Sequence, residues 1–176
     1  MIKLVRVDQD YIKELRKVDN NVQINSTEMN KETKPFLGVL FQVDWMEYFV
    51  PLSSPKAKHN NMSNTIDFHK IYGENGKLRA VLNFNNMVPV VPALYEVIDI
   101  NNDKDKYVLL EEYRYCKGKE ELLRKKAELY YQKFCNNHLT PSQKGRTCNF
   151  LKLEQVLIKK MEAKTKEKIE THKHSK

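Results

Sequence analysis

The clearest structural signal in this sequence is the stretch FHKIYGENGKLRAVL, residues 68–82. Two runs rich in aromatic and aliphatic residues, 68–72 and 78–82, flank the dipeptide Asn75-Gly76. A tight turn between antiparallel strands needs positive φ at its centre, and Asn-Gly adopts that conformation at little steric cost. The stretch therefore predicts a β-hairpin.

Further strand-like runs lie on both sides of this hairpin. Residues 36–41 and 46–50 form two such runs around a short turn at Asp44. Residues 1–7 are read as a first strand, and residues 87–90 as another that Pro89 limits to an edge or an end. Together these runs predict a mainly antiparallel sheet.

Helical patterns frame this sheet and dominate the second half of the chain. Asp8 can cap a short helix with Tyr11, Leu15 and Val18 on one face, and the polar residues 20–34 are predicted as a loop. Later helices are expected over 107–117, along the stripe Leu123, Ala127, Tyr130 and Phe134, and, after a loop at 140–145, along Leu153, Val156, Leu157 and Met161. Strands followed by helices indicate an α+β fold, a single domain over residues 1–176 with a basic helical or frayed tail at 159–176.

Composition and charge narrow the functional classes. The chain has 176 residues, 40% hydrophobic and 31% charged, with a mean hydropathy of −0.68. No stretch approaches the ~20 apolar residues that cross a bilayer, and the apolar content is too high for a mainly disordered chain. The net charge is +8, half of it from residues 159–176. A Lys-rich helical end is most often a solvated face, so charge suggests a polyanionic partner without proving one.

The cysteines, histidines and acidic residues do not show the spacing of a metal site or a disulfide framework. The three cysteines, Cys116, Cys135 and Cys148, lack the spacing of a zinc or disulfide framework and fit a reducing cytoplasm. Asp99, Asp103 and Asp105 lack the spacing and the terminal Glu of a calcium loop. His172 and His174 lie near the end of the basic tail, where a metal site is poorly held. We therefore expect no metal, no cofactor and no membrane segment.

The residues that carry chemistry gather in PLSSPKAKH, residues 51–59, directly after a hydrophobic strand. Seven positions hold two hydroxyls, two ammonium groups and an imidazole. One interpretation is a polar loop with turn-forming Ser and Pro. The other is a phosphodiester site, where hydroxyls and backbone N–H groups bond the non-bridging oxygens and a Lys offsets the charge of a pentacoordinate phosphorus.

The absence of a convincing acidic cluster for magnesium favours metal-free cleavage, if cleavage occurs. RNA carries its own nucleophile for such a reaction, because its 2′-hydroxyl can attack the adjacent phosphorus, whereas DNA lacks that group. The protein has to align the attack, stabilise the phosphorane and help protons leave the 2′-oxygen and reach the 5′-oxygen. In this scheme Ser serves as a hydrogen-bonding group or proton relay, without a covalent intermediate.

Two motifs resemble the ToxN/AbiQ family, the endoribonuclease toxins of type III toxin–antitoxin systems. They are YFVPLSSPKAKH at 48–59 and LNFNNMVPV at 82–90, which is similar to the family's L-N-x-N-N-M-x-P-V strand. Supporting matches lie at 36–39, 70–72, 148–150 and 153–154. Order and spacing agree over roughly residues 1–155, whereas residues 60–64 and the tail after Lys159 show no firm correspondence.

The resemblance implies a compact, twisted antiparallel β core with peripheral helices, similar to MazF/Kid-type toxins. It implies metal-independent cleavage of single-stranded RNA, often at A-rich sequences, leaving a 2′,3′-cyclic phosphate and a 5′-hydroxyl. It also implies inhibition by a small RNA antitoxin, whose pseudoknotted repeats the toxin cuts from a precursor and binds in a closed protein–RNA assembly. Cellular or phage mRNAs are then the substrates, and phage defence by abortive infection is the outcome.

The resemblance also assigns catalytic candidates. Ser53 matches the hydroxyl position associated with cleavage, Ser54 its hydroxyl neighbour, and Lys56 the ammonium that would face the phosphate. Tyr11 matches a family tyrosine, although its spacing with the apolar residues of the first helix equally fits a core aromatic.

The remaining candidates are expected to bind RNA. Lys58 and His59 continue the first motif, and the imidazole is also a candidate general acid or base. Asn85 and Asn86, with Asn83, either pin a loop through their side-chain amides or recognise bases. Further phosphate contacts are expected from Lys34 and Arg79.

Three functions are compatible with these patterns. The favoured one is an RNA-cleaving toxin held in check by RNA. The second is a non-catalytic RNA-binding module that uses Lys34, Lys56, Lys58, Arg79 and the basic run 124–126 as phosphate contacts. The third is an interaction protein whose Lys/Glu tail binds a protein or an acidic surface.

Overall fold

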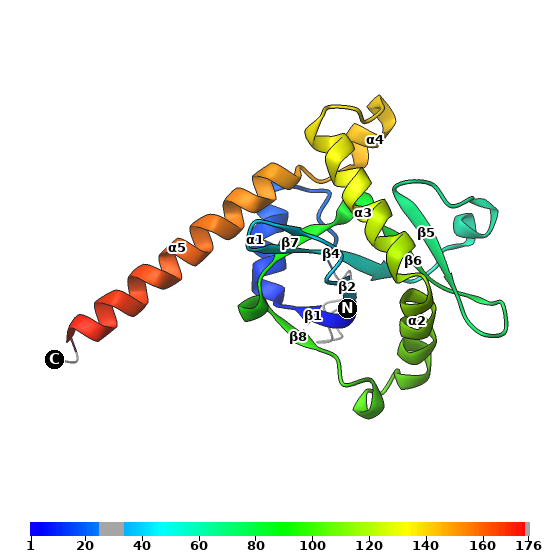
Figure 1. The fold of residues 1–176 in the computed structure, drawn as a ribbon, viewed down its shortest axis with the longest axis horizontal. Helices are drawn as coiled ribbons and strands as arrows, with labels where there is room; N and C mark the ends of the chain where they lie inside the picture. Colours follow the sequence, from blue (N-terminus) through cyan, green and yellow to red (C-terminus); the bar gives the residue numbers. More distant parts are fainter. Residues whose placement is uncertain (25–33, 175–176) are drawn as a thin grey trace.

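The computed structural model, which describes residues 1–24 and 34–174, contains an eight-stranded antiparallel sheet surrounded by helices (Figure 1). The strands are β1 (Lys3–Val7), β2 (Pro35–Gly38), β3 (Gln42–Val43), β4 (Met46–Ser53), β5 (Phe68–Tyr72), β6 (Leu78–Asn83), β7 (Val88–Val90) and β8 (Tyr95–Val97). Their order is β5-β6-β4-β2-β1-β8, and β3 and β7 pair with β4 beside this path. Four α-helices follow the last described strand, which confirms the predicted α+β class.

The hairpin predicted at 68–82 is present and meets the central strand. β5 and β6 pair in antiparallel register, and Gly76 at the turn has a φ of 73°. β6 pairs in turn with the end of β4, where Ser53 lies opposite Val81. β2 pairs with Val50 and Pro51 on the other edge of β4, so the C-terminal end of β4 is held between β2 and β6, whereas β3 and β7 pair with its first half. This end of β4 is where the 51–59 segment leaves the sheet.

The strand predicted over 36–41 is interrupted after Gly38. β2 pairs with Val50 and Pro51 of β4, whereas β3 pairs with Met46 and Glu47 nearer the start of the same strand. Gly38 lies against the ring of Phe49, where a Cβ atom would come within 2.5 Å of ring carbons. The predicted turn at Asp44 is confirmed, with a φ of 52°.

The first helix, α1 (Gln9–Val18), begins where the sequence predicted it. The Asp8 carboxylate accepts a hydrogen bond from the backbone N–H of Tyr11 at 2.7 Å, which satisfies a free donor of the first turn. Tyr11, Ile12 and Leu15 are buried against the sheet. Val18, predicted on the same face, is 46% exposed because it lies at the end of the helix. Most of the predicted loop at 20–34 lies outside the described residues.

Two of the later helices match the prediction, and one replaces a predicted loop. α2 (Lys106–Gly118) and α3 (Glu120–Cys135) form as expected. Residues 140–145 were predicted as a loop, but Pro141–Arg146 forms the short helix α4. The Thr140 hydroxyl accepts from the Gln143 N–H at 3.2 Å, and the Gln143 side chain accepts from the Thr140 N–H at 3.0 Å. This capping box, with Pro at the first helical position, stabilises a helix too short to show apolar periodicity.

The last helix, α5 (Phe150–His174), starts in the core and then projects away from the body (Figure 1). Phe150, Leu153 and Leu157 are fully buried. The Glu154 carboxylate accepts hydrogen bonds from the hydroxyls of Tyr48 on β4 and Tyr131 on α3, at 2.5 and 2.7 Å. These bonds tie two helices to the central strand. Within the described part of the chain, no helix is long and apolar enough to cross a membrane.

Candidate functional site

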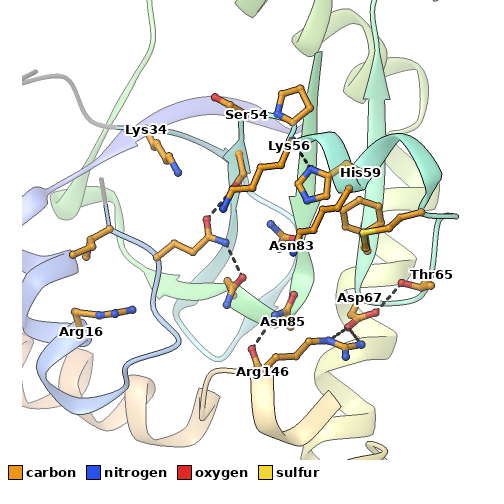
Figure 2. Close-up of a pocket in the computed structure, with 18 residues that line it drawn as sticks. Arg16, Lys34, Ser54, Lys56, His59, Thr65, Asp67, Asn83, Asn85 and Arg146 are labelled. Atoms are coloured by element: carbon orange, nitrogen blue, oxygen red, sulfur yellow. Dashed lines mark hydrogen bonds and ion pairs between the residues drawn. The ribbon is translucent and has the colours of Figure 1, made fainter. Parts of the chain in front are cut away.

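A cavity of about 900 Å³ opens where the end of β4 meets the β5–β6 hairpin, the turn after α1 and the end of α4 (Figure 2). Eight of the ten predicted site residues line it: Lys34, Ser53, Ser54, Lys56, Lys58, His59, Asn85 and Asn86. They come from segments separated by up to about fifty residues, so the cavity exists only once the sheet has formed. The sequence motifs at 48–59 and 82–90 thus meet at one site.

The lining is strongly cationic. Its described residues include five Lys or Arg side chains, Arg16, Lys34, Lys56, Lys58 and Arg146, and a single carboxylate, Asp67. Both burial and the nearby charge of Lys56 lower the pKa of Lys34, with burial the larger cause. An anion between these two ammonium groups would relieve their repulsion. The cavity is therefore suited to a phosphate chain.

Ser53 is the last residue of β4 rather than part of a loop, and its side chain is nearly buried. Its hydroxyl donates to Gln23 Oε1 at 2.8 Å, and Gln23 Nε2 donates to Asn86 Oδ1 at 2.9 Å. Asn86 Nδ2 donates in turn to the carbonyl of Asn21 at 2.8 Å. The only hydrogen of the Ser53 hydroxyl is thus donated to Gln23, and Ser53 Oγ can still accept a hydrogen bond from a molecule in the cavity.

The turn after Ser53 is built around His59. The Lys56 N–H donates to His59 Nδ1 at 2.9 Å, and the His59 N–H donates to the Lys56 carbonyl at 2.8 Å, at the start of the short helix η1 (Ala57–Asn61). Burial, followed by the charges of Lys58, Lys56 and Lys70, lowers the pKa of His59. Because Nδ1 accepts the backbone hydrogen bond, the neutral ring carries its hydrogen on Nε2. Its observed role is to hold the turn that carries Ser54, Lys56 and Lys58, all exposed.

Two predicted residues do not line the cavity. Tyr11 is fully buried, and its hydroxyl donates to the carbonyl of Pro89 at 2.7 Å. Burial raises the pKa of this phenol far above its ordinary value, with a smaller contribution from Glu14. Arg79 points instead to Glu111 on α2, with its Nε 2.5 Å from the carboxylate. The geometry gives Tyr11 a packing role and Arg79 an ion-pair role, both outside the lining of the cavity.

Asn85 and Asn86, two of the three asparagines in the second motif, line the cavity and are also held by hydrogen bonds to neighbouring segments. Asn86 is held by the Gln23 chain, and Asn85 Nδ2 donates to the carbonyl of Arg146 at 2.8 Å. Their segment, η2 (Phe84–Asn86), is thereby fixed to the turn after α1 and to the end of α4. This observation favours loop pinning, the first of the two roles considered for them.

Sequence reasoning missed five polar residues of the lining: Arg16, Gln23, Thr65, Asp67 and Arg146. None lies in either motif, and only their tertiary contacts bring them to the cavity. Arg16 donates to the carbonyls of Asn20 and Val22, which shapes the turn that carries Gln23. The capping box at Thr140 was the available local signal that residue 146 ends a helix.

The family model described as "Toxin ToxN, type III toxin-antitoxin system" matches residues 3–158. The chain belongs to the ToxN family. The endoribonuclease ToxN of Bacillus thuringiensis subsp. kurstaki is 30% identical over 162 residues, with 87% of this chain and 81% of that protein covered. The predicted resemblance is thus confirmed, and this ToxN family member is an endoribonuclease.

Solved structures agree with the family assignment. A toxin of a type III system in which a non-coding RNA pseudoknot selectively inhibits the toxin is 28% identical, with a TM-score of 0.73 over 88% of this chain and 94% of that one. The lactococcal anti-phage endoribonuclease AbiQ is 20% identical, with a TM-score of 0.78 over 92% and 99% of the two chains. The second likeness shows that the ToxN fold is shared. The family model ends at residue 158, whereas α5 continues to His174.

Proposed function

We propose that this toxin cleaves single-stranded, A-rich RNA in the cavity at the end of β4, without a metal ion. The 2′-oxygen bonds to the adjacent phosphorus while the bond from phosphorus to the 5′-oxygen breaks, which leaves a 2′,3′-cyclic phosphate and a 5′-hydroxyl. One proton leaves the 2′-oxygen and one reaches the 5′-oxygen, and no water is consumed. The observation that carries this proposal is the juxtaposition of Ser53, Lys56 and Lys34 on one cationic cavity.

The hydrogen bonding of Ser53 suggests its role. Since its hydrogen is donated to Gln23, the oxygen faces RNA as an acceptor and can hold the hydrogen of an attacking 2′-hydroxyl. A hydroxyl held in line with the phosphorus removes much of the entropic cost of the attack. Ser54, one residue further and exposed, can donate to a non-bridging oxygen. Ser53 thus aligns the nucleophile and Ser54 assists at the phosphate.

Charge compensation of the phosphorane falls to Lys56 and Lys34. The only carboxylate among the described lining residues is Asp67, and its two oxygens already accept from Thr65 and Arg146. A divalent cation that activates a phosphate is held by carboxylates with free oxygens, and this donor set does not supply them. Lys34 is only partly exposed, so its ammonium group stabilises the developing charge more strongly than it would in open water.

We propose that an RNA pseudoknot inhibits this toxin, as the relative with the solved pseudoknot-inhibited system supports. The antitoxin is cut from a repeated precursor by the toxin itself, and its cleaved end remains in the same cavity. A closed protein–RNA assembly then keeps the toxin inactive in the cytoplasm. Release of the toxin on infection leads to cleavage of cellular or phage mRNA and to abortive infection.

The proposal is tested by incubating the purified protein with A-rich RNA in EDTA. Discrete fragments are expected, with 3′ ends that resist tailing until the cyclic phosphate is opened and removed. Retardation of intact RNA without fragments would mean that this protein binds RNA without cutting it in this way. Fragments that appear only when magnesium is added would contradict the metal-free mechanism.

A further inference from the structure

The side of the cavity opposite the Ser53–Lys56 turn carries Arg146, an arginine that the sequence motifs do not include. Figure 2 shows Arg146 and Asp67 at one side, Lys34, Ser54 and Lys56 at the other, and Asn83 and Asn85 between them. Arg146 ends α4, and two hydrogen bonds tie the backbone around it to Asn85. Its carbonyl accepts from Asn85 Nδ2 at 2.8 Å, and the N–H of Cys148 donates to the Asn85 carbonyl at 2.8 Å.

The Arg146 side chain is held as firmly as its backbone. Nε and Nη2 both donate to Asp67 Oδ2, at 2.9 and 2.7 Å, while Nη1 donates to Ser142 on the same helix. The other oxygen of Asp67 accepts from the Thr65 hydroxyl at 2.8 Å. The Asp67 side chain is only 4% exposed, whereas that of Arg146 is 48% exposed. A buried carboxylate thus fixes the orientation of an open guanidinium.

The Arg146 guanidinium, although fixed, can still donate a hydrogen bond to a ligand in the cavity. Of its five N–H groups, one on Nη2 has no hydrogen-bond acceptor within the described residues. An arginine whose rotamer is already set loses less side-chain entropy when it binds an oxyanion. Both partners of this ion pair, Arg146 at the end of α4 and Asp67 directly before β5, also line the cationic cavity.

We propose that Arg146 is a second phosphate-binding residue of the toxin, which holds the phosphate next to the scissile one, and that Asp67 is its positioning residue. This inference rests on the proposed cleavage at Ser53 and Lys56. Two separated phosphate contacts place the intervening ribose, and therefore its 2′-hydroxyl, over the reactive end of the cavity. Arg146 accordingly contributes to RNA affinity and register rather than to the chemical step.

The matched variants are Arg146→Gln and Lys144→Gln, which remove one positive charge from the same helix. Lys144 is exposed and does not line the cavity. Their binding to a fluorescent, A-rich, 2′-fluoro RNA, which keeps the phosphates but lacks the nucleophile, is measured by anisotropy over a range of salt concentrations.

Arg146→Gln is expected to bind about tenfold more weakly at low salt, because a charge-assisted hydrogen bond is lost. Its log–log salt slope should be shallower by about 0.7, as for one phosphate on a single strand. Lys144→Gln should stay within about twofold of the wild type.

Two further variants separate positioning from charge. Arg146→Lys keeps the charge and should keep the salt slope, but it loses the fork held by Asp67 and should bind a few-fold more weakly. Asp67→Asn should also weaken binding, and the double variant with Arg146→Gln should bind no more weakly than Arg146→Gln alone, because Asp67 acts through Arg146. Additive losses would show that Asp67 has an independent role.

Each remaining outcome is decisive. If Arg146→Gln changes the preferred cleavage sequence with an unaltered salt slope, the residue contacts a base and the phosphate assignment is wrong. If it lowers the melting temperature while the RNA affinity of the folded protein is unchanged, the ion pair is structural only. A wild-type protein that fails to cut RNA in EDTA overturns the proposed function, whereas a wild type that cuts while Arg146→Gln matches Lys144→Gln overturns this inference alone.

Discussion

Ser53→Ala removes one hydroxyl from the end of β4 and leaves the backbone pairing of the strand in place. The lost contact is the 2.8 Å hydrogen bond to Gln23 Oε1, and the backbone still pairs opposite Val81. A neutral hydrogen bond of this kind is worth about 1 kcal/mol of stability. For a protein of 176 residues, that amounts to a fall in melting temperature of about 2–4 °C. The variant should therefore be fully folded at 25 °C.

The effect on cleavage is expected to be much larger than the effect on folding. Removal of one group that aligns or stabilises a reacting oxygen typically costs about 10²–10³ in rate, or roughly 3–4 kcal/mol of transition-state stabilisation. This exceeds the lost hydrogen-bond energy severalfold. A rate loss of that size in a folded protein has to arise at the reacting atoms.

Single-turnover cleavage of A-rich RNA in EDTA, with the toxin in saturating excess, measures the chemical step without a contribution from affinity. Thermal unfolding of the same samples gives the stability change. Ser63→Ala is the matched control, because Ser63 is exposed and does not line the cavity. If Ser53→Ala cuts within about threefold of the wild-type rate, Ser53 does not align the nucleophile and the mechanism proposed above is wrong.

Three further predictions concern stability. Burial, with the charges of Lys126 and Lys119, lowers the pKa of His69 to about 4 from 6.5. As the pH drops from 6.5 to 4, the unfolded chain takes up this proton first, so the free energy of unfolding should fall by up to about 3 kcal/mol. Urea titrations of His69→Gln should no longer show this fall. Gly38→Ala should destabilise the protein by about 1–3 kcal/mol, because the added Cβ would lie 2.5 Å from the Phe49 ring. Gly145→Ala should raise the melting temperature slightly, because Gly145 lies on α4 with open space around it and alanine favours a helix more than glycine does. A chain stopped after Lys164 should melt within about 2 °C of the full chain, because Met161 is the last described α5 side chain that packs on the core.

The controls for these predictions lie in the same chain. His138→Gln, at an exposed histidine, should retain the acid-dependent loss of stability, and a loss that survives in His69→Gln would have to come from other groups. Equal melting temperatures for the two alanine variants would show that the sheet shifts to admit a methyl group at residue 38. A large drop on truncation would mean that the projecting part of α5 stabilises the body.

The sequence alone determined the turns and helix starts that are stabilised by residues close together in the chain. The Asn75-Gly76 turn, the Asp8 cap and the turn at Asp44 were predictable because positive φ and a free N–H at a helix start are satisfied by neighbours in the chain. The motif at 51–59 likewise identified the segment that carries the hydroxyls and ammonium groups. For the same reason the Thr140 capping box was readable in the sequence, although a six-residue helix offered no periodicity to accompany it.

Only the tertiary structure decided which side chains share the cavity. Ser53 meets Gln23 across 30 residues and Asp67 meets Arg146 across 79, and no local pattern encodes either distance. The same packing buried Tyr11 in the core and turned Arg79 toward α2, although each had a plausible role by sequence. Helix and turn propensities depend on residues that are neighbours in the chain. The residues that line the cavity depend instead on how distant strands pair and on which loops that pairing brings together.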